Sequence, residues 1–347
     1  MRARGALWLR LREAGLVEGE LPASVPRPPW FVRLMLGIAG WMGAVFLLIF
    51  VGIGFAALMR SPTAGIAVGA AICTAAVFLF RAAKGDLISQ FAFAISLAGQ
   101  ALMAIGFGNA LGHSTGAVAL CIAVQQAALF ALAPSFVHRV WTATSGTYAA
   151  AFALGQFGLG PYAPALLTAA FAAVWLRELE HARHGELVRA AGYGVAFAAV
   201  LSVSESSLPM LWRRDPTSAL HVWAGAVACG AVLVWAAVQL LRREGVSLAS
   251  AQGRTALVGA VILAATSLKA PGIAPAIAIL VLGYANGNRP LAGLGVLALI
   301  AYLSHYYYWL QATLLEKSAL LAVAGIALLL VRLALQRAWP AKEAGHA

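Results

Sequence analysis

The stretch Gly283-Tyr-Ala-Asn-Gly-Asn-Arg-Pro290 leads into an apolar run that ends at Ser304-His-Tyr-Tyr-Tyr-Trp309. The first segment is rich in Gly, Asn and Pro, the residues that turns prefer. The second places consecutive aromatic residues at the end of a run long enough to cross a bilayer. Tyr and Trp keep their rings at the acyl boundary and their polar tips among the headgroups. The stretch therefore predicts a turn, a membrane-spanning helix and an interfacial corner.

A further helix is predicted directly after this corner. Thr313-Leu-Leu-Glu316 precedes the apolar run 319–331. Thr followed three residues later by Glu is the pattern of a capping box, in which both side chains satisfy amide donors at the start of a helix. We therefore expect Thr313 and Glu316 to form a structural helix cap.

The corner is also a candidate docking surface for a partner. His305, Tyr307 and Lys317 combine aromatic area and charge at one level of the membrane, which suits a protein interface. An interfacial anchor is the alternative interpretation, because aromatic belts with a flanking Lys are common in membrane helices.

The composition is that of a membrane protein. Hydrophobic residues make up 62% of the 347 residues and charged residues 10%, whereas soluble domains carry about 25% charged residues. The net charge of +12 comes from Lys and Arg residues that are scattered through short loops. We therefore expect membrane lipids, and not nucleic acid, as partners.

Twelve apolar runs are candidate membrane spans. They predict an all-α fold, a polytopic transmembrane helix bundle of about 12 spans over residues 34–335. Residues 1–33 are expected as a cytoplasmic arm that is either an interfacial amphipathic helix or a solvated segment, and 336–347 as a cytoplasmic tail. The runs are 34–59, 63–80, 88–108, 115–133, 140–157, 161–176, 188–204, 219–241, 255–269, 271–286, 290–309 and 317–335.

The topology depends on the short runs 255–269 and 271–286, which are either two spans or one interrupted element. With two spans, most of the 24 Lys and Arg residues lie on one side of the membrane. A single span weakens this bias and places Lys269 inside the bilayer, where a charge is unfavourable. We therefore predict two spans, with both termini in the cytoplasm.

Several helix starts are marked by capping residues. Ser61-Pro62 offers an N-cap followed by Pro in the first turn, Asp86 is a candidate cap of the third span, and Ser114 or Thr115 of the fourth. These residues predict where the helices begin.

Two pairs of glycines have the spacing of close helix packing. Gly65 and Gly69, and likewise Gly283 and Gly287, are four residues apart in apolar sequence. Small residues at this spacing let helix backbones approach each other in a membrane. We expect both pairs to lie at helix interfaces.

Polar side chains gather in the third to fifth runs, where no Asp, Glu, Lys or Arg lies at the centre of a span. The candidates are Gln100, Gln125, Gln126 and Thr144. Hydrogen bonding between helices is the plain interpretation. A path for a polar substrate between these spans is the functional one.

We predict no catalytic residue, no cofactor and no metal ligand. The sequence has no Gly-x-Ser-x-Gly motif and no phosphate-binding loop. Cys73, Cys121 and Cys229 lie in apolar runs without the spacing of a zinc site, as small hydrophobic residues would. We therefore expect a protein that is not an enzyme.

Two stretches resemble an uncharacterised family of bacterial inner-membrane proteins that is grouped as a domain of unknown function. One runs from Pro29-Trp-Phe-Val-Arg-Leu34 through Gly40-Trp41, preceded by Leu11-Arg-Glu-Ala-Gly-Leu16. The other runs from Gly287-Asn-Arg-Pro-Leu291 through Tyr306-Tyr-Tyr308 to Thr313-Leu-Leu-Glu-Lys-Ser318. The resemblance implies location in the bacterial inner membrane. It also implies two partners: a second multi-pass membrane protein and a membrane-anchored exported protein.

Two functions are compatible with these features. The first is a non-enzymatic subunit of a membrane assembly, which the predicted topology and the resemblance favour. The alternative is a transporter or flippase of a small or lipidic substrate, which the number of spans and the polar residues of the third to fifth runs favour.

Overall fold

A computed structural model describes residues 61–309 apart from 84, 113, 179, 181–183, 207–217 and 269–271, together with parts of 8–50 and residues Leu315 and Ser318. Its continuous part consists of helices and their connections. The α-helices are α3 (Pro62–Ala82), α4 (Asp86–Ala110), α5 (Thr115–Leu132), α6 (Phe136–Leu154), α7 (Ala163–Leu176), α8 (Gly185–Ser206), α9 (Ser218–Arg243), α10 (Ala251–Ser267), α11 (Ile273–Ala285) and α12 (Arg289–Trp309). Each apolar run predicted between 63 and 309 overlaps one of these helices, although 140–157 and 161–176 extend into the two turns between α6 and α7.

Six segments of the described chain are long and apolar enough to cross a membrane. They lie in α3, α4, α5, α8 and α9, and in the stretch from α6 through α7; α11 and α12 contain shorter apolar helices. The expectation of an all-α membrane protein is therefore confirmed. The first and last predicted spans, 34–59 and 317–335, lie outside the continuously described residues.

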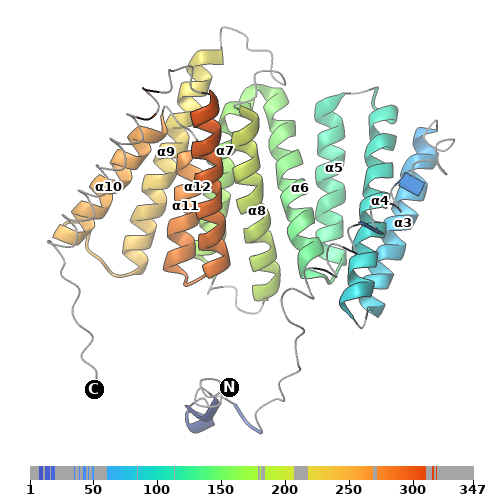
Figure 1. Ribbon diagram of the computed structural model, residues 1–347, viewed down its shortest axis with the longest axis horizontal. Coiled ribbons are helices and arrows are strands. Elements are labelled where there is room, and N and C mark those ends of the chain that lie inside the picture. Colours follow the sequence, from blue (N-terminus) through green and yellow to red (C-terminus); the bar gives the residue numbers. More distant parts are fainter. Residues whose placement is uncertain are drawn as a thin grey trace.

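The helices stand side by side in a broad row from α3 to α10 (Figure 1). Successive helices run in opposite directions, so their ends lie along the two long edges of this row. Neighbours in the row are not always neighbours in sequence. Helix α8 packs against both α6 and α7, while α11 packs on α7 and α12. The end of α7 and the start of α8 lie at the same edge of the row as the end of α11 and the start of α12, the lower edge in Figure 1.

Predicted capping residues mark several helix boundaries. Ser61 is the N-cap of α3, where its side chain accepts a hydrogen bond from the Ala64 amide, and Pro62 is in the first turn. Ser114 is the N-cap residue of α5 but forms no capping hydrogen bond through its side chain. Asp86 is the first residue of α4 and Gly85 its N-cap, so the prediction of Asp86 as the cap was wrong by one residue.

Helices α6 and α7 are separated by a break that the sequence encodes. A π-helical turn, Gly155–Leu159, and a 3-10 turn, Gly160–Tyr162, connect them. Gly158 has a φ of 78°, a conformation that glycine adopts without the steric cost other residues meet. Pro161 then removes an amide donor from the next turn.

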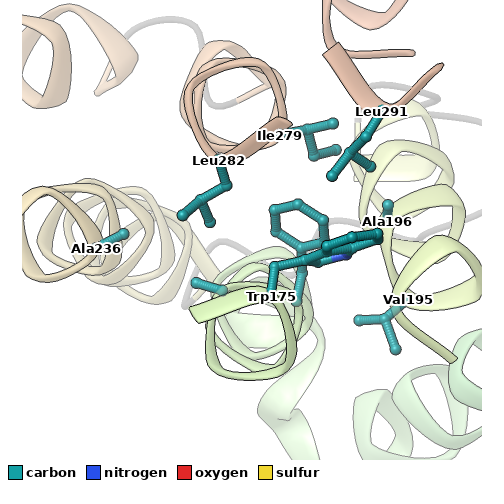
Figure 2. Packing of buried hydrophobic residues seen from close by; sticks show 9 residues of the cluster. Trp175, Val195, Ala196, Ala236, Ile279, Leu282 and Leu291 are labelled. Carbon is teal, nitrogen blue, oxygen red and sulfur yellow. The ribbon is translucent and has the colours of Figure 1, made fainter. Parts of the chain in front are cut away.

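The largest buried side chains lie where α7, α8, α11 and α12 meet. Trp175 of α7 lies between Ala196 of α8 and Ile279 of α11, with Leu291 of α12 close by (Figure 2). Gly192 on α8 makes room for the indole, because a Cβ there would lie 2.6 Å from Nε1 of Trp175. Burial and van der Waals contact of these residues hold the four helices together.

The two glycine pairs have different roles. Gly65 and Gly69 are buried on α3, and a Cβ on Gly69 would lie 2.7 Å from the carbonyl oxygen of Gly99 on α4. This pair is at a helix interface, as predicted. Gly283 also packs against α12. Gly287, however, follows the end of α11 with a φ of 63°, so its prediction as an interface residue was wrong because the helix ends before it.

The close approach of α3 and α4 gives a stability prediction. Gly69→Ala should lower the free energy of unfolding by about 1–3 kcal/mol, because the new Cβ would overlap the Gly99 carbonyl and the Met103 amide. Gly108→Ala on α4 is the matched control, since nothing lies within 4 Å of its Cβ position. Unfolding of the purified protein in detergent measures both. Equal stability of the two variants would contradict the predicted backbone contact.

Candidate functional site

The structure brings two of the predicted polar residues, Gln100 and Gln126, together between α4, α5 and α6. Gln126 Nε2 donates to Gln100 Oε1 over 2.9 Å. Trp141 Nε1 on α6 donates to the same oxygen over 3.2 Å. Gln100 therefore accepts hydrogen bonds from both neighbouring helices and is the hub of a buried polar network.

The network continues from Gln100 to a serine and a histidine. Gln100 Nε2 donates to Ser96 Oγ over 2.9 Å, and Ser96 Oγ lies 2.8 Å from Nε2 of His138. Because Ser96 already accepts from Gln100, its own proton can be donated to His138 Nε2. The rings of Phe80 and Phe93 pack edge-on to the imidazole, with centroids 5.0 and 5.8 Å away.

A serine beside a histidine is also the arrangement of a nucleophile and its base. Ser96 is 1% exposed and His138 0% exposed. Both side chains are therefore buried in the described structure, and the rings of Phe80 and Phe93 pack against the imidazole. The geometry therefore fits a hydrogen-bonded link between helices better than a catalytic pair.

Some buried polar atoms of the network, and of Gln125 next to it in sequence, have no hydrogen-bond partner among the described residues. These are both amide atoms of Gln125, Oε1 of Gln126 and Nδ1 of His138. Buried polar atoms without partners are unfavourable in an apolar environment. They are places where water or a polar solute would be stabilised, so the predicted polar path through Gln100, Gln125 and Gln126 stays a prediction.

The other predicted residues lie elsewhere. Thr144 is on α6, but its hydroxyl donates to the Val140 carbonyl of its own helix, and its backbone faces Gly194 of α8. His305 and Tyr307 are in the last turns of α12, and their side chains lie outside the described residues. Thr313, Glu316 and Lys317 also lie outside them. The cap and the docking surface stay predictions.

A groove that the sequence did not reveal lies between α6, α8 and the start of α12. Its volume is about 1300 Å³. Apolar side chains of the three helices form its walls, and charged and polar residues form its mouth at the end where α7 and α8 connect. The lining residues are Phe136, Val137, Val140, Glu178, Gly185, Glu186, Arg189, Tyr193, Phe197, Asn286, Gly287, Asn288, Arg289, Pro290 and Leu294.

The turn between α11 and α12 shapes this mouth. The Asn288 amide donates to the Gly283 carbonyl and the Gly287 amide to the Tyr284 carbonyl, which is a Schellman motif with glycine in its left-handed position. Asn288 then caps α12, since its Oδ1 accepts from the Leu291 amide over 3.2 Å. The stretch from Gly283 to Pro290 is therefore the end of one helix followed directly by the start of the next.

Side chains of the same turn connect it to neighbouring helices. Tyr193 on α8 donates its hydroxyl to Asn288 Oδ1 over 2.8 Å. Asn286 Nδ2 donates to the Trp175 carbonyl on α7 over 3.0 Å, and its Oδ1 accepts from Arg243 on α9 over 2.7 Å. These bonds hold the start of α12 beside α8. Tyr193, Asn286 and Asn288 themselves line the groove.

The charged residues at the mouth are partly paired. Arg189 Nε lies 2.7 Å from Glu178 Oε1, and the Glu178 side chain is only 14% exposed. Glu186 and Arg289 are exposed, and neither forms an ion pair within the described part of the chain. The mouth therefore presents one carboxylate and one guanidinium to whatever enters the groove.

Sequence reasoning missed the groove and His138 for different reasons. The groove combines residues that are more than 100 positions apart, such as Val137 and Leu294, and no local pattern links them. His138 was placed in a connection because the apolar run begins at 140, whereas α6 begins at Phe136. The signal that could have found it was Pro134-Ser135, a pattern that precedes helix starts.

The network gives a prediction about its hub. Gln100→Leu should lower the free energy of unfolding by about 1–3 kcal/mol, because Trp141, Gln126 and Ser96 lose a partner while remaining in an apolar environment. Thr144→Val is the control and should have little effect, since this hydroxyl bonds only within α6. Unfolding in detergent compares the two, and an unchanged Gln100→Leu stability would contradict the network.

Comparison with known proteins gives one match. A family model described as "Domain of unknown function (DUF4401)" covers residues 29–338. No curated protein and no solved structure matches the chain. The match includes both stretches on which the resemblance to a family of unknown function rests, apart from the preceding residues 11–16. The chain, an all-α membrane protein with a charged groove at one end of its helices, therefore belongs to the DUF4401 family.

Proposed function

We propose that this protein is a non-enzymatic integral membrane protein that binds an amphiphile in its groove, as a transporter or flippase of a lipidic substrate does. The observation behind the proposal is the order of side chains in the groove. Charged residues lie at its mouth, and Phe136, Val137, Val140, Phe197 and Leu294 line its walls. An amphiphile is arranged in the same way, with a polar headgroup at one end followed by an apolar chain.

The depth of the groove supports this proposal. Along α8 its lining runs from Gly185 to Phe197, which is about 18 Å at the rise of an α-helix. The hydrocarbon core of a bilayer is roughly 30 Å thick. The charged mouth takes up Gly185 to Arg189, so the wall beyond it, up to Phe197, is about 12 Å long. A headgroup at the mouth would therefore place its acyl chain along the wall through roughly 40% of the core.

The proposal predicts that filling the groove removes bound lipid. Val137 lines the groove and is 57% exposed, so Val137→Trp should occupy the space without disturbing the core. Lipid retained after purification in mild detergent should fall several-fold, as measured by mass spectrometry of the extracted sample. Val124→Trp on α5 is the control, because Val124 is 65% exposed and lies outside the groove.

The two variants separate groove binding from general lipid contact. Loss of lipid in both would indicate an effect on the surrounding belt. Retention of lipid in Val137→Trp would contradict the proposal.

A role as a subunit of a membrane assembly is our second proposal. It is supported by α10 at the end of the row, which packs on α9 and α11 and leaves Val258, Val261 and Ile262 more than half exposed. We propose as partners a second multi-pass protein and an anchored exported protein. The same purification tests this role, since a stoichiometric protein that remains bound to wild type supports it and recovery of the chain with lipid alone contradicts it.

We also propose that the chain has 12 spans in the bacterial inner membrane with both termini in the cytoplasm. The distribution of Lys and Arg supports this orientation. Successive helices from α3 to α12 run in opposite directions (Figure 1), which supports counting each of them as one span. The mouth of the groove would then face the cytoplasm.

The orientation predicts which engineered cysteines react in intact cells. In a background without Cys73, Cys121 and Cys229, a cysteine replacing Ser206 should react with an impermeant thiol reagent. Glu244 directly follows the end of α9, which lies at the opposite edge of the row from the end of α8 (Figure 1). A cysteine replacing Glu244 should react only after the membrane is permeabilised. The reverse pattern would show that the mouth of the groove faces outward.

A further inference from the structure

We propose that the groove selects a phospholipid whose headgroup carries a protonated primary amine beside its phosphate, the phosphatidylethanolamine class. This inference rests on the proposed binding of an amphiphile and names the class of amphiphile. The argument comes from the two charges at the mouth that have no partner in the described structure.

The phosphate would bind at the start of α12. Arg289 is the first residue of that helix. The N-terminus of a helix carries a partial positive charge, so the guanidinium of Arg289 is in an unfavourable position unless an anion binds nearby. Arg243 lies close to the same turn, because its guanidinium donates to Asn286 over 2.7 Å. Arg289 in the groove lining and Arg243 outside it thus bring positive charge to the same turn, and an anion bound at Arg289 would offset that charge.

The amine would bind at the start of α8. Glu186 is in the first turn of that helix, where the dipole stabilises a carboxylate. Arg189 is one turn further on, but it is paired with Glu178 at 2.7 Å and so does not neutralise Glu186. The mouth therefore offers an uncompensated anion as well as an uncompensated cation.

A headgroup with both charges fits this pair better than one with a single charge. A phosphatidylglycerol headgroup would meet Arg289 through its phosphate, but its hydroxyl groups would offer Glu186 hydrogen bonds without a positive charge. A phosphatidylcholine headgroup carries both charges, but its quaternary ammonium has no N–H to donate to a carboxylate. Only the primary amine combines charge with hydrogen bonding.

The test is a competition on the purified full-length protein. Delipidated protein is incubated with equal amounts of the three phospholipids in one detergent, all with the same acyl chains, and bound lipid is measured by native mass spectrometry. Phosphatidylethanolamine should be enriched about fivefold over each competitor, the ratio that one partly exposed charge-assisted contact supplies. Matched acyl chains ensure that the ratio reports the headgroup alone.

Two variants assign the preference to the proposed groups. Glu186→Gln should abolish the enrichment while leaving total lipid binding in place. Arg289→Gln should lower the binding of all three lipids together, because all three contain the phosphate. Glu244→Gln and Arg254→Gln are the controls, because both residues are exposed and lie outside the groove. Glu244 follows α9 and Arg254 is in the first turn of α10, at the edge of the row where α8 and α12 begin.

The outcomes distinguish this inference from the proposed function on which it rests. Equal binding of the three lipids by wild type, or an enrichment that survives Glu186→Gln, would overturn the amine site and leave amphiphile binding intact. Binding that Val137→Trp does not reduce would overturn both. The wild-type competition needs no variant, so the inference stays testable even if a substitution prevents folding.

Discussion

Two asparagine side chains in one turn connect the start of α12 to the rest of the described helices. Asn286 bonds to α7 and α9, and Asn288 bonds to α8 and caps α12. The bonds from Tyr193 to Asn288 and from Asn286 to the Trp175 carbonyl are partly buried, so removing either asparagine side chain would leave a shielded polar group without its partner. The turn therefore decides where α12 begins relative to α8, and the groove exists because of that placement.

The buried network of α4, α5 and α6 and the apolar core around Trp175 hold the helices in different ways. The core gains from close van der Waals contact of Trp175, Phe171 and Ile279. The network instead links helices through Gln100 and His138, whose polar atoms would otherwise face an apolar environment. Both halves thus combine packing with hydrogen bonds: the bonds lie within the spans around Gln100 and at the helix ends around Asn286 and Asn288.

The groove connects this architecture to function. Two of its walls come from α8 and α12, which the Trp175 core packs together, and the third comes from α6; its unpaired charges come from the first turns of α8 and α12. Helix N-termini favour anions, which suits Glu186 at one and makes Arg289 at the other an attractive point for a phosphate. Apolar walls below a charged mouth are complementary to an amphiphile, and this complementarity is the physical basis of the proposed function.

The sequence by itself determined that this is an all-α membrane protein and where its described helices lie. Apolar length, Ser61-Pro62, and the turn Gly283 to Pro290 are local signals, since each acts through a few neighbouring residues. Local signals could also identify Gln100, Gln125 and Gln126 as polar residues within spans. Only the tertiary structure decided that Gln100 and Gln126 join Ser96 and His138 in one network while Gln125 and Thr144 do not, because the face a helix buries depends on which helix packs beside it. It also decided the groove, since Val137, Glu186 and Arg289 come together only when α8 packs between α6 and α12, and no spacing along the chain encodes that contact.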